Sequence, residues 1–157
     1  MLERFAKESG LLPRAPEPAR PDDLEAVMVL VHAAELPTSG IADNFPGSYS
    51  VVRVGNAIVA VAGLEAHGGV GLLRSVAVAS SERGAGLGRQ LVEDRLRIAR
   101  EQKLSAVYLL TTTAAEYFRS LGFSDASRQE APDDLRRSSE FASVCPSSAV
   151  CLQKQLS

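Results

Sequence analysis

Residues 72–88 read LLRSVAVASSERGAGLG. The first seven residues, Leu72–Val78, have the apolar and β-branched character of a strand, and Arg83–Gly88 is a glycine-rich turn directly before an amphipathic helical pattern. A strand that passes through glycines into a helix start presents backbone N–H groups and the positive end of the helix dipole at one place. Because glycines leave no side chain in the way, this stretch predicts an anion-binding turn.

Two common phosphate-binding motifs do not fit this turn. A Rossmann turn needs a further glycine where the chain has Leu91, and a Walker loop needs a Gly-Lys-Ser/Thr triplet, which the sequence lacks. The pattern that fits is R-x-x-G-x-G, from Arg83 to Gly88, after the Val-Ala-Val of residues 76–78. On its own, this pattern also fits an ordinary helix-capping turn.

Composition sets the broad class of the protein. A chain of 157 residues predicts one domain that buries about 70% of its unfolded surface. The net charge of −2 argues against a general nucleic-acid binder, and no apolar run approaches the roughly 18 residues needed to cross a membrane. Residues 1–10 are polar and charged, which disfavours a secretory signal, and two cysteines make no disulfide framework. We therefore expect a cytoplasmic protein.

The rest of the chain alternates between helix and strand patterns. Residues 1–13 show no sustained periodicity, so we expect a flexible leader there and a folded domain over 14–157. Helices are predicted at 21–35, 84–102 and 114–121, with a short one within 132–141; strands are predicted at 50–54, 57–66, 71–79, 104–112, from 123 onward and at 149–156. Hairpins and a helical crossover together predict an α/β (α+β) fold with a mixed sheet of six to seven strands and helices on both faces.

The dipeptide Gly68-Gly69 predicts a two-residue hairpin turn, which sets the pairing of the flanking strands. The expected pairs are His67 with Val70, Glu65 with Leu72, and Gly63 with Arg74. In this register Glu65 and Arg74 are diagonal neighbours on one face, which Arg74 shares with Leu72, Val76 and Val78. A slip of one residue would place the two charges on opposite faces.

Arg74 is the unusual residue of this strand, because an unpaired charge on an apolar face costs several kcal/mol. Two partners are open at this point: a structural salt bridge to Glu65, or an anionic group of a bound substrate. Gly63, opposite Arg74, leaves room for the arginine side chain or for a ligand.

The strand, the glycine turn, the following helix and a downstream Leu121-Gly122-Phe123 together resemble the acyl-CoA signature of the GCN5-related N-acetyltransferases, the GNAT superfamily. The resemblance covers roughly residues 15–156. It implies the GNAT fold, acetyl-CoA as cosubstrate, an amine acceptor and no metal. It also implies cofactor contacts, from Val76, Ala77 and Val78 to pantetheine and thioester, and from Arg83, Gly84, Gly86, Gly88 and Arg89 to the pyrophosphate.

Acetyl transfer needs a neutral amine, a polarised thioester carbonyl and a thiol that can leave. The family pattern implies that the amide of Val78 polarises the carbonyl. Glu65 is a candidate base for the amine, directly or through water, and both Glu65 and Arg74 are candidate substrate-binding residues.

The chain departs from the family pattern at two positions. The tyrosine that relatives commonly use to protonate the leaving thiol is replaced by Phe118, and Tyr117 lies one place earlier, about 100° around the helix. Tyr117 is thus either a displaced acid or a packing residue. Thr111 stands where many relatives carry asparagine, and it either contacts the cofactor or ends the strand and caps the next helix.

A narrower resemblance is to the arsenic-operon-associated N-acetyltransferases, the ArsN type. It rests on Leu72–Val78, Val107–Phe118 and Ser138–Leu152. It implies a small acidic amino acid, or a toxic arsenic- or phosphorus-containing glutamate analogue, as acceptor in a detoxification role. Arg74 suits such substrates because guanidinium pairs bidentately with carboxylate, phosphinate or arsonate. The acceptor pocket is expected between the loop after the first helix and residues 138–148.

Other functions stay open at this stage. One is acetylation of a protein or peptide amine; another is a non-catalytic acyl-CoA or metalloid-binding module, for which Cys145 and Cys151 are candidate ligands. The expected partner is a small-molecule amine, without nucleic acid or membrane, and a homodimer is an alternative to a monomer.

Overall fold

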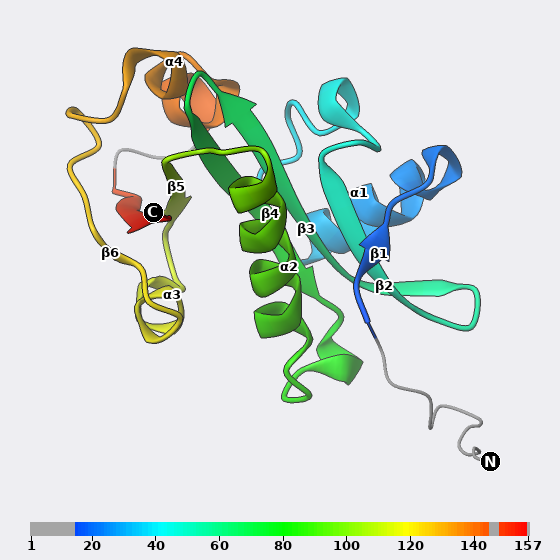
Figure 1. The fold of residues 1–157 in the computed structure, drawn as a ribbon. Helices are drawn as coiled ribbons and strands as arrows, with labels where there is room; N and C mark the ends of the chain where they lie inside the picture. The colour runs from blue at the N-terminus through cyan, green and yellow to red at the C-terminus, as the bar shows by residue number, and fades with distance from the viewer. Residues whose placement is uncertain (1–14, 145–147, 157) are drawn as a thin grey trace.

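The computed structural model describes residues 15–144 and 148–156 (Figure 1). The predicted leader at 1–13 and Cys145 lie outside the described residues. Within them, the strands form one seven-stranded sheet in the order β1-β2-β3-β4-β5-β7-β6. The strands are β1 (Glu17–Pro18), β2 (Tyr49–Val54), β3 (Ala57–His67), β4 (Val70–Val78), β5 (Ala106–Thr111), β6 (Ser124–Asp125) and β7 (Val150–Gln155). Among the strands of the described residues, only β4 and β5 pair in parallel, so the predicted mixed sheet is confirmed.

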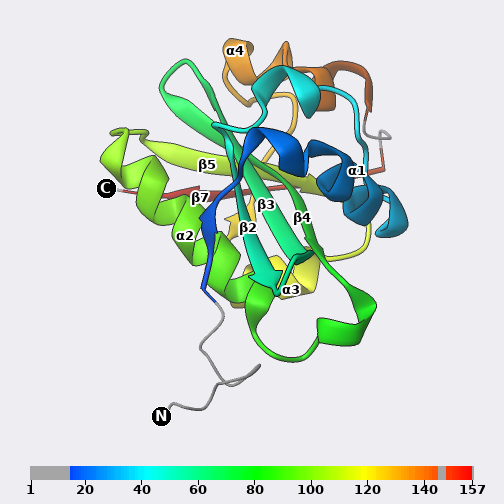
Figure 2. The ribbon, with the colours of Figure 1, turned by 90° about the vertical axis from the view of Figure 1, so that its right-hand side faces the viewer.

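Helices cover both faces of this sheet. They are α1 (Leu24–Ala33), α2 (Leu87–Glu101), α3 (Ala115–Ser120) and α4 (Asp133–Arg136), with short turns at Pro21–Asp23, Ala42–Asn44, Ser80–Glu82 and Glu140–Val144. Figure 1 shows α2 in front of the sheet and α1 behind it, and Figure 2 gives the side view. No helix in the described ranges is long and apolar enough to span a membrane.

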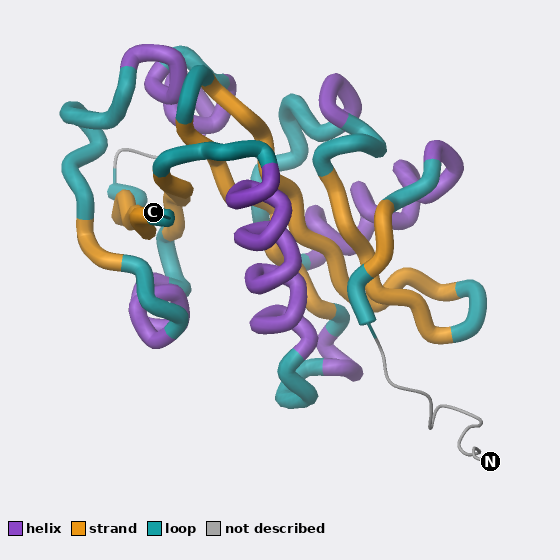
Figure 3. Tube along the Cα trace, viewed as in Figure 1, coloured by secondary structure: helices purple, strands orange, loops and turns teal. Residues whose placement is uncertain are grey.

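Each helix docks through the apolar stripe that its sequence provides. On one face, α2 packs Leu91, Val92 and Leu96 against the sheet, and α3 adds Phe118. On the other face, α1 buries Val27 and Val31, and α4 buries Leu135 in a separate cluster. The purple helices and orange strands of Figure 3 show α2 running along the sheet.

The predicted hairpin register is confirmed. His67 lies opposite Val70, Glu65 opposite Leu72, and Gly63 opposite Arg74. A local turn therefore aligned the two strands, because a two-residue loop leaves the pairing little freedom.

Several predicted boundaries are wrong. The long helix begins at Leu87 and not at residue 84, because Gly84 and Gly86 adopt positive φ angles of 87° and 81°, which a right-handed helix cannot include. The strand expected from 123 onward has only two residues, Ser124–Asp125. The segment 132–141 divides into α4 and the π-helical turn Glu140–Val144.

Candidate active site

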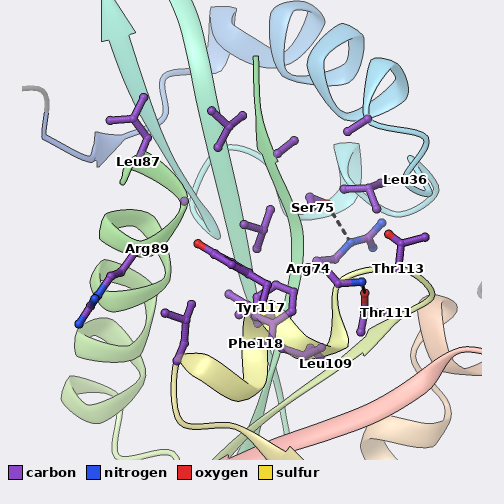
Figure 4. A pocket seen from close by; sticks show the side chains of 18 of the residues that line it. Leu36, Arg74, Ser75, Leu87, Arg89, Leu109, Thr111, Thr113, Tyr117 and Phe118 are labelled. Atoms are coloured by element: carbon purple, nitrogen blue, oxygen red, sulfur yellow. Dashed lines mark hydrogen bonds between the residues drawn. The ribbon is translucent and has the colours of Figure 1, made fainter. Parts of the chain in front are cut away.

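A cavity of about 680 Å³ lies between the ends of β4 and β5 (Figure 4). Residues Val70–Leu72 of β4 pair with Ala106–Tyr108 of β5, and the two strands separate beyond this point. Residues 73–78 of β4 and 109–111 of β5 then line the cavity from its two sides. The outer end of the cavity is the glycine turn before α2. Its inner end contains Leu36, Pro37, Arg74 and Glu140. The structure therefore brings Leu36 and Pro37 of the loop after α1 together with Glu140, a residue of the segment expected on the other side of an acceptor.

A β-bulge in β4 shapes this cavity. Val61 pairs with Ala77 and Gly63 with Arg74, so two residues, Ser75 and Val76, oppose a single residue of β3. Ser75 has a φ of 59°, which is uncommon for a residue with a side chain. The extra residue reverses the alternation of side chains along the strand.

The bulge corrects one sequence-based expectation. Val76 and Val78 do not share the face of Arg74, because beyond Ser75 they pack against the α2 side of the sheet. Ala77 takes the α1 side instead. The space opposite Arg74 at Gly63 is also filled, since a Cβ at Gly63 would overlap the ring of Tyr49.

The outer end has the features of an anion site. Gly84 and Gly86 have positive φ, and a Cβ built on either residue meets no atom within 4 Å, so the turn is open to a ligand. The first N–H groups of the 15-residue helix α2 point toward it. Arg83 and Arg89 are exposed, with Arg83 Nε donating to the carbonyl of Val78 at 3.2 Å. This geometry fits a diphosphate, because open backbone donors meet there with Arg83 beside them. Arg89 is paired with Glu93 at 3.2 Å, and its guanidinium points away from the cavity in Figure 4.

Tyr117 also reaches this end of the cavity. Its hydroxyl lies so close to Gly88 that a Cβ there would be 2.8 Å from it, and Tyr117 is 41% exposed. Burial raises the pKa of its phenol. Phe118 is buried and packs edge-on against Phe123, although it too lines the cavity. Because the tyrosine lies at position 117 and not at 118, its hydroxyl points to the glycine turn, while the position of Phe118 faces the core.

Thr111 lies at the end of β5 and lines the cavity (Figure 4). Its Oγ1 accepts a hydrogen bond from the N–H of Ala114 at 2.9 Å. This bond closes the turn between β5 and α3. The N-cap of α3 is Ala114, which has no side-chain cap, so Thr111 ends the strand without capping the helix. The cofactor contact of Thr111 stays a prediction.

Arg74 is the centre of the inner end. Its side chain is 0% exposed and its Nη1 donates to Glu65 at 3.2 Å. Nη2 donates to the carbonyls of Pro37 and Ser39, and Nε to Ser75 Oγ. The predicted salt bridge to Glu65 is confirmed. The structure adds Glu140, whose Oε1 lies 3.4 Å from Nε.

The two carboxylates beside Arg74 differ in their surroundings. Glu65 accepts from Arg74, from Asn44 Nδ2 at 3.1 Å and from His67 Nε2 at 3.0 Å. Burial alone would raise the pKa of Glu65, but the hydrogen bonds from His67 and Arg74 hold it below its usual range. Glu65 is not one of the described residues that line the cavity.

Glu140 does line the cavity and is 4% exposed. Burial raises the pKa of Glu140 to about 7, against the attraction of Arg74 and with a contribution from the negative charge of Glu65. Sequence reasoning gave no site role to His67 or to Glu140. The buried acid in the apolar run after Ser138 was the available signal for the second.

The described residues give little support for a role of the cysteines or of a metal ion. Cys151 is a free, buried thiol, and burial raises its pKa to about 11. Across residues 15–144 and 148–156, no group of three His, Cys, Asp or Glu side chains could hold a metal ion.

Solved structures with the same fold come from several organisms. N-acetylglutamate synthase from Neisseria gonorrhoeae, complexed with coenzyme A and N-acetyl-glutamate, is 19% identical with a TM-score of 0.81 over 93% of this chain. The match covers 36% of the synthase, so this chain spans about a third of that relative's length. Rv2747 from Mycobacterium tuberculosis, in complex with CoA, is 21% identical with a TM-score of 0.78, covering 91% of this chain and 99% of that one.

A third structure of the same fold is the ribosomal-protein-S18-alanine N-acetyltransferase from Escherichia coli. It is 16% identical with a TM-score of 0.66, covering 92% of this chain and 95% of that one. The sequence itself matches the model of the acetyltransferase (GNAT) family over residues 12–123, which is more than half of the chain. The glycine turn, the bulged strand and the diverging strand ends all lie within or beside this match, and the chain belongs to the acetyltransferase (GNAT) family.

Proposed function

We propose that the protein transfers the acetyl group of acetyl-CoA to the amine of a small acidic amino acid or of a toxic glutamate-like analogue that contains arsenic or phosphorus. Its role is then detoxification, in line with the ArsN-type resemblance of residues 72–78, 107–118 and 138–152. When bound, acetyl-CoA supplies the acetyl group and a thiol that can leave.

The outer half of the cavity supports the cosubstrate. We assign the pyrophosphate to the turn Arg83–Gly88 with Arg89, and the pantetheine arm to Val76, Ala77 and Val78, with Thr111 on the opposite wall. The N–H of Val78 is the donor proposed to polarise the carbonyl. Tyr117 is the proposed acid, and water can replace it because a thiol of pKa ~8.5 costs only about 2 kcal/mol to release as thiolate near pH 7.

The inner half supports a zwitterionic acceptor. A cation and an anion, Arg74 and Glu140, line the cavity side by side. The four hydrogen bonds of Arg74 to described residues use Nε, one N–H of Nη1 and both of Nη2. We propose that an acidic group of the acceptor pairs with Arg74 and that its ammonium group pairs with Glu140.

The single observation that carries the proposal is one cavity that joins a diphosphate-type turn to a buried pair of opposite charges. The test is release of CoA thiol from acetyl-CoA in the presence of different amines. The panel contains glutamate, glutamine, phosphinate and arsenic-containing glutamate analogues, lysine, and a peptide with a free N-terminal alanine. We expect turnover with the acidic amino acids and none with the peptide.

Other outcomes would redirect the proposal. Preference for the peptide would favour a protein amine acetyltransferase. Binding of acetyl-CoA by calorimetry, without turnover of any amine, would favour a non-catalytic acyl-CoA module. Absence of any binding would overturn the proposal entirely.

A further inference from the structure

Two buried carboxylates share one guanidinium at the inner end of the cavity, and only one of them faces the cavity. Glu65 on β3 and Glu140 in the π-helical turn both lie against Arg74, at 3.2 Å and 3.4 Å. Pairs of carboxylates whose environments differ in this way commonly divide the acid and base roles of a site. Which of the two can exchange a proton with a ligand is decided by their contacts.

Glu65 is already committed to other groups. Both of its oxygens accept hydrogen bonds, Oε1 from His67 and Oε2 from Arg74 and Asn44. These donors favour the ionised form, which makes the carboxylate a weak base. Since Glu65 is also absent from the described cavity wall, a substrate amine has no direct path to it.

Glu140 has the opposite properties. It lines the cavity, is almost fully buried, and has Arg74 as its one ion-pair partner in the described part of the chain. A buried carboxylate holds a proton more readily than an exposed one.

We propose that Glu140 is the catalytic base, accepting a proton from the ammonium group of the acceptor. The inference rests on the proposed acetyl transfer and names the residue that prepares its nucleophile. Glu65 becomes a positioning residue, because it holds Arg74 and through Arg74 the carboxylate of Glu140.

The proton and bond changes balance as follows. The acceptor ammonium gives one proton to the carboxylate of Glu140. Its nitrogen then forms the N–C bond to the acetyl carbon while the C–S bond breaks. The sulfur takes a proton from Tyr117 or water, and the second proton leaving nitrogen replaces that proton. Glu140 returns its proton to solvent before the next turnover.

The charged and titratable groups around Glu140 support this role. Arg74 from β4 attracts the ionised form, Glu65 from β3 repels it, and the phenol of Tyr49 on β2 lies within electrostatic range. Burial, opposed by Arg74 and reinforced by Glu65, raises the pKa of Glu140 to about 7, where a base is partly ionised and still able to take a proton.

The test is the pH dependence of kcat/KM for the best acceptor. Wild-type protein should lose activity below a midpoint near pH 7. The isosteric variant Glu140→Gln cannot accept a proton, so we expect kcat/KM at pH 7 to fall by about 100-fold or more and this acid limb to vanish. Binding of acetyl-CoA, measured by calorimetry, should stay unchanged, and Glu101→Gln, the same change on the exposed end of α2, should match the wild type.

Two further measurements separate proton transfer from packing. In Glu65→Gln the acid limb should persist but move to lower pH, because the charge that raises the pKa of Glu140 is gone. An aminooxy analogue of the acceptor, whose nitrogen is already unprotonated at pH 7, should restore Glu140→Gln to nearly wild-type rates.

The outcomes are distinguishable. If Glu140→Gln keeps kcat/KM within about threefold and retains the acid limb, Glu140 is not the base, while the proposed function stands. An acid limb that disappears in Glu65→Gln and not in Glu140→Gln would assign the base to Glu65. If the wild type acetylates no amine of the panel, the proposed function itself fails.

Discussion

The two ends of the cavity handle charge in opposite ways. At the glycine turn the proposed anion-binding groups are backbone amides, and the nearby Arg89 is 67% exposed. At the inner end Arg74 is completely buried between two carboxylates. Exposed charges are screened and replaceable, whereas buried charges depend on one another. Acetyl-CoA binding at the outer end should therefore depend on the backbone conformation of the turn. Protein stability at the inner end should depend on the charges of the buried side chains.

The largest expected effect is at the inner end. Replacing Arg74 by Met leaves two buried carboxylates without their cation, so we expect a loss of about 3–5 kcal/mol in the free energy of unfolding. Urea denaturation at pH 7 measures it, and Arg89→Met is the matched control, with an expected loss below about 0.5 kcal/mol because its partner Glu93 is also exposed. Equal losses in the two variants would remove the distinction between the ends.

The next effect is a pH-dependent gain in stability from Glu140→Gln. The pKa of Glu140 is raised from 4.5 to about 7 in the folded state, so between these values the native protein keeps a proton that the unfolded chain has released. Stability of the wild type should therefore fall as pH rises through this window, by about 3 kcal/mol. The Gln variant should lack this fall.

Unfolding curves of the wild type and Glu140→Gln at pH 4 and pH 8 test this sign. We expect similar stabilities at pH 4 and a more stable variant at pH 8. A difference that does not change with pH would mean that the burial of Glu140 carries no charge penalty.

At the outer end the sensitive element is the backbone. Gly86 has a φ of 81°, where a side chain costs about 1–2 kcal/mol, so Gly86→Ala should pull the turn out of its anion-binding shape. We expect acetyl-CoA to bind about tenfold more weakly, which is ~1.4 kcal/mol, as measured by calorimetry. Gly47→Ala is the control, since Gly47 has open space and no positive φ. Unchanged affinity in Gly86→Ala would contradict the assignment of the turn.

The smallest effect is expected for Tyr117→Phe. Tyr117 is half-exposed with its hydroxyl beside Gly88. A CoA thiol of pKa ~8.5 can take its proton from water at a cost of about 2 kcal/mol. Turnover should therefore fall by no more than about threefold. A loss of 100-fold would instead make Tyr117 the required acid and would give the outer end its own charge-sensitive group.

Much of the fold followed from local signals. Gly68-Gly69 forms a two-residue hairpin turn, which fixes the register of β3 and β4. Glu65 and Arg74 are therefore neighbours on one face. Glycines at 84 and 86 mark the turn into α2, although they also delay the helix to Leu87. These features were predictable because each depends on the conformational limits of a few consecutive residues.

The amino-acid sequence by itself determined the hairpin register that makes Glu65 and Arg74 neighbours on one face, and the glycine turn that precedes α2. Only the tertiary structure decided which side of β4 Val76 and Val78 occupy, because the bulge is at Ser75, a residue that carries no local signal for positive φ. It also decided that Glu140, far along the chain, reaches the same guanidinium and faces the cavity. Such long-range encounters depend on how whole elements pack, and no short segment of sequence specifies them.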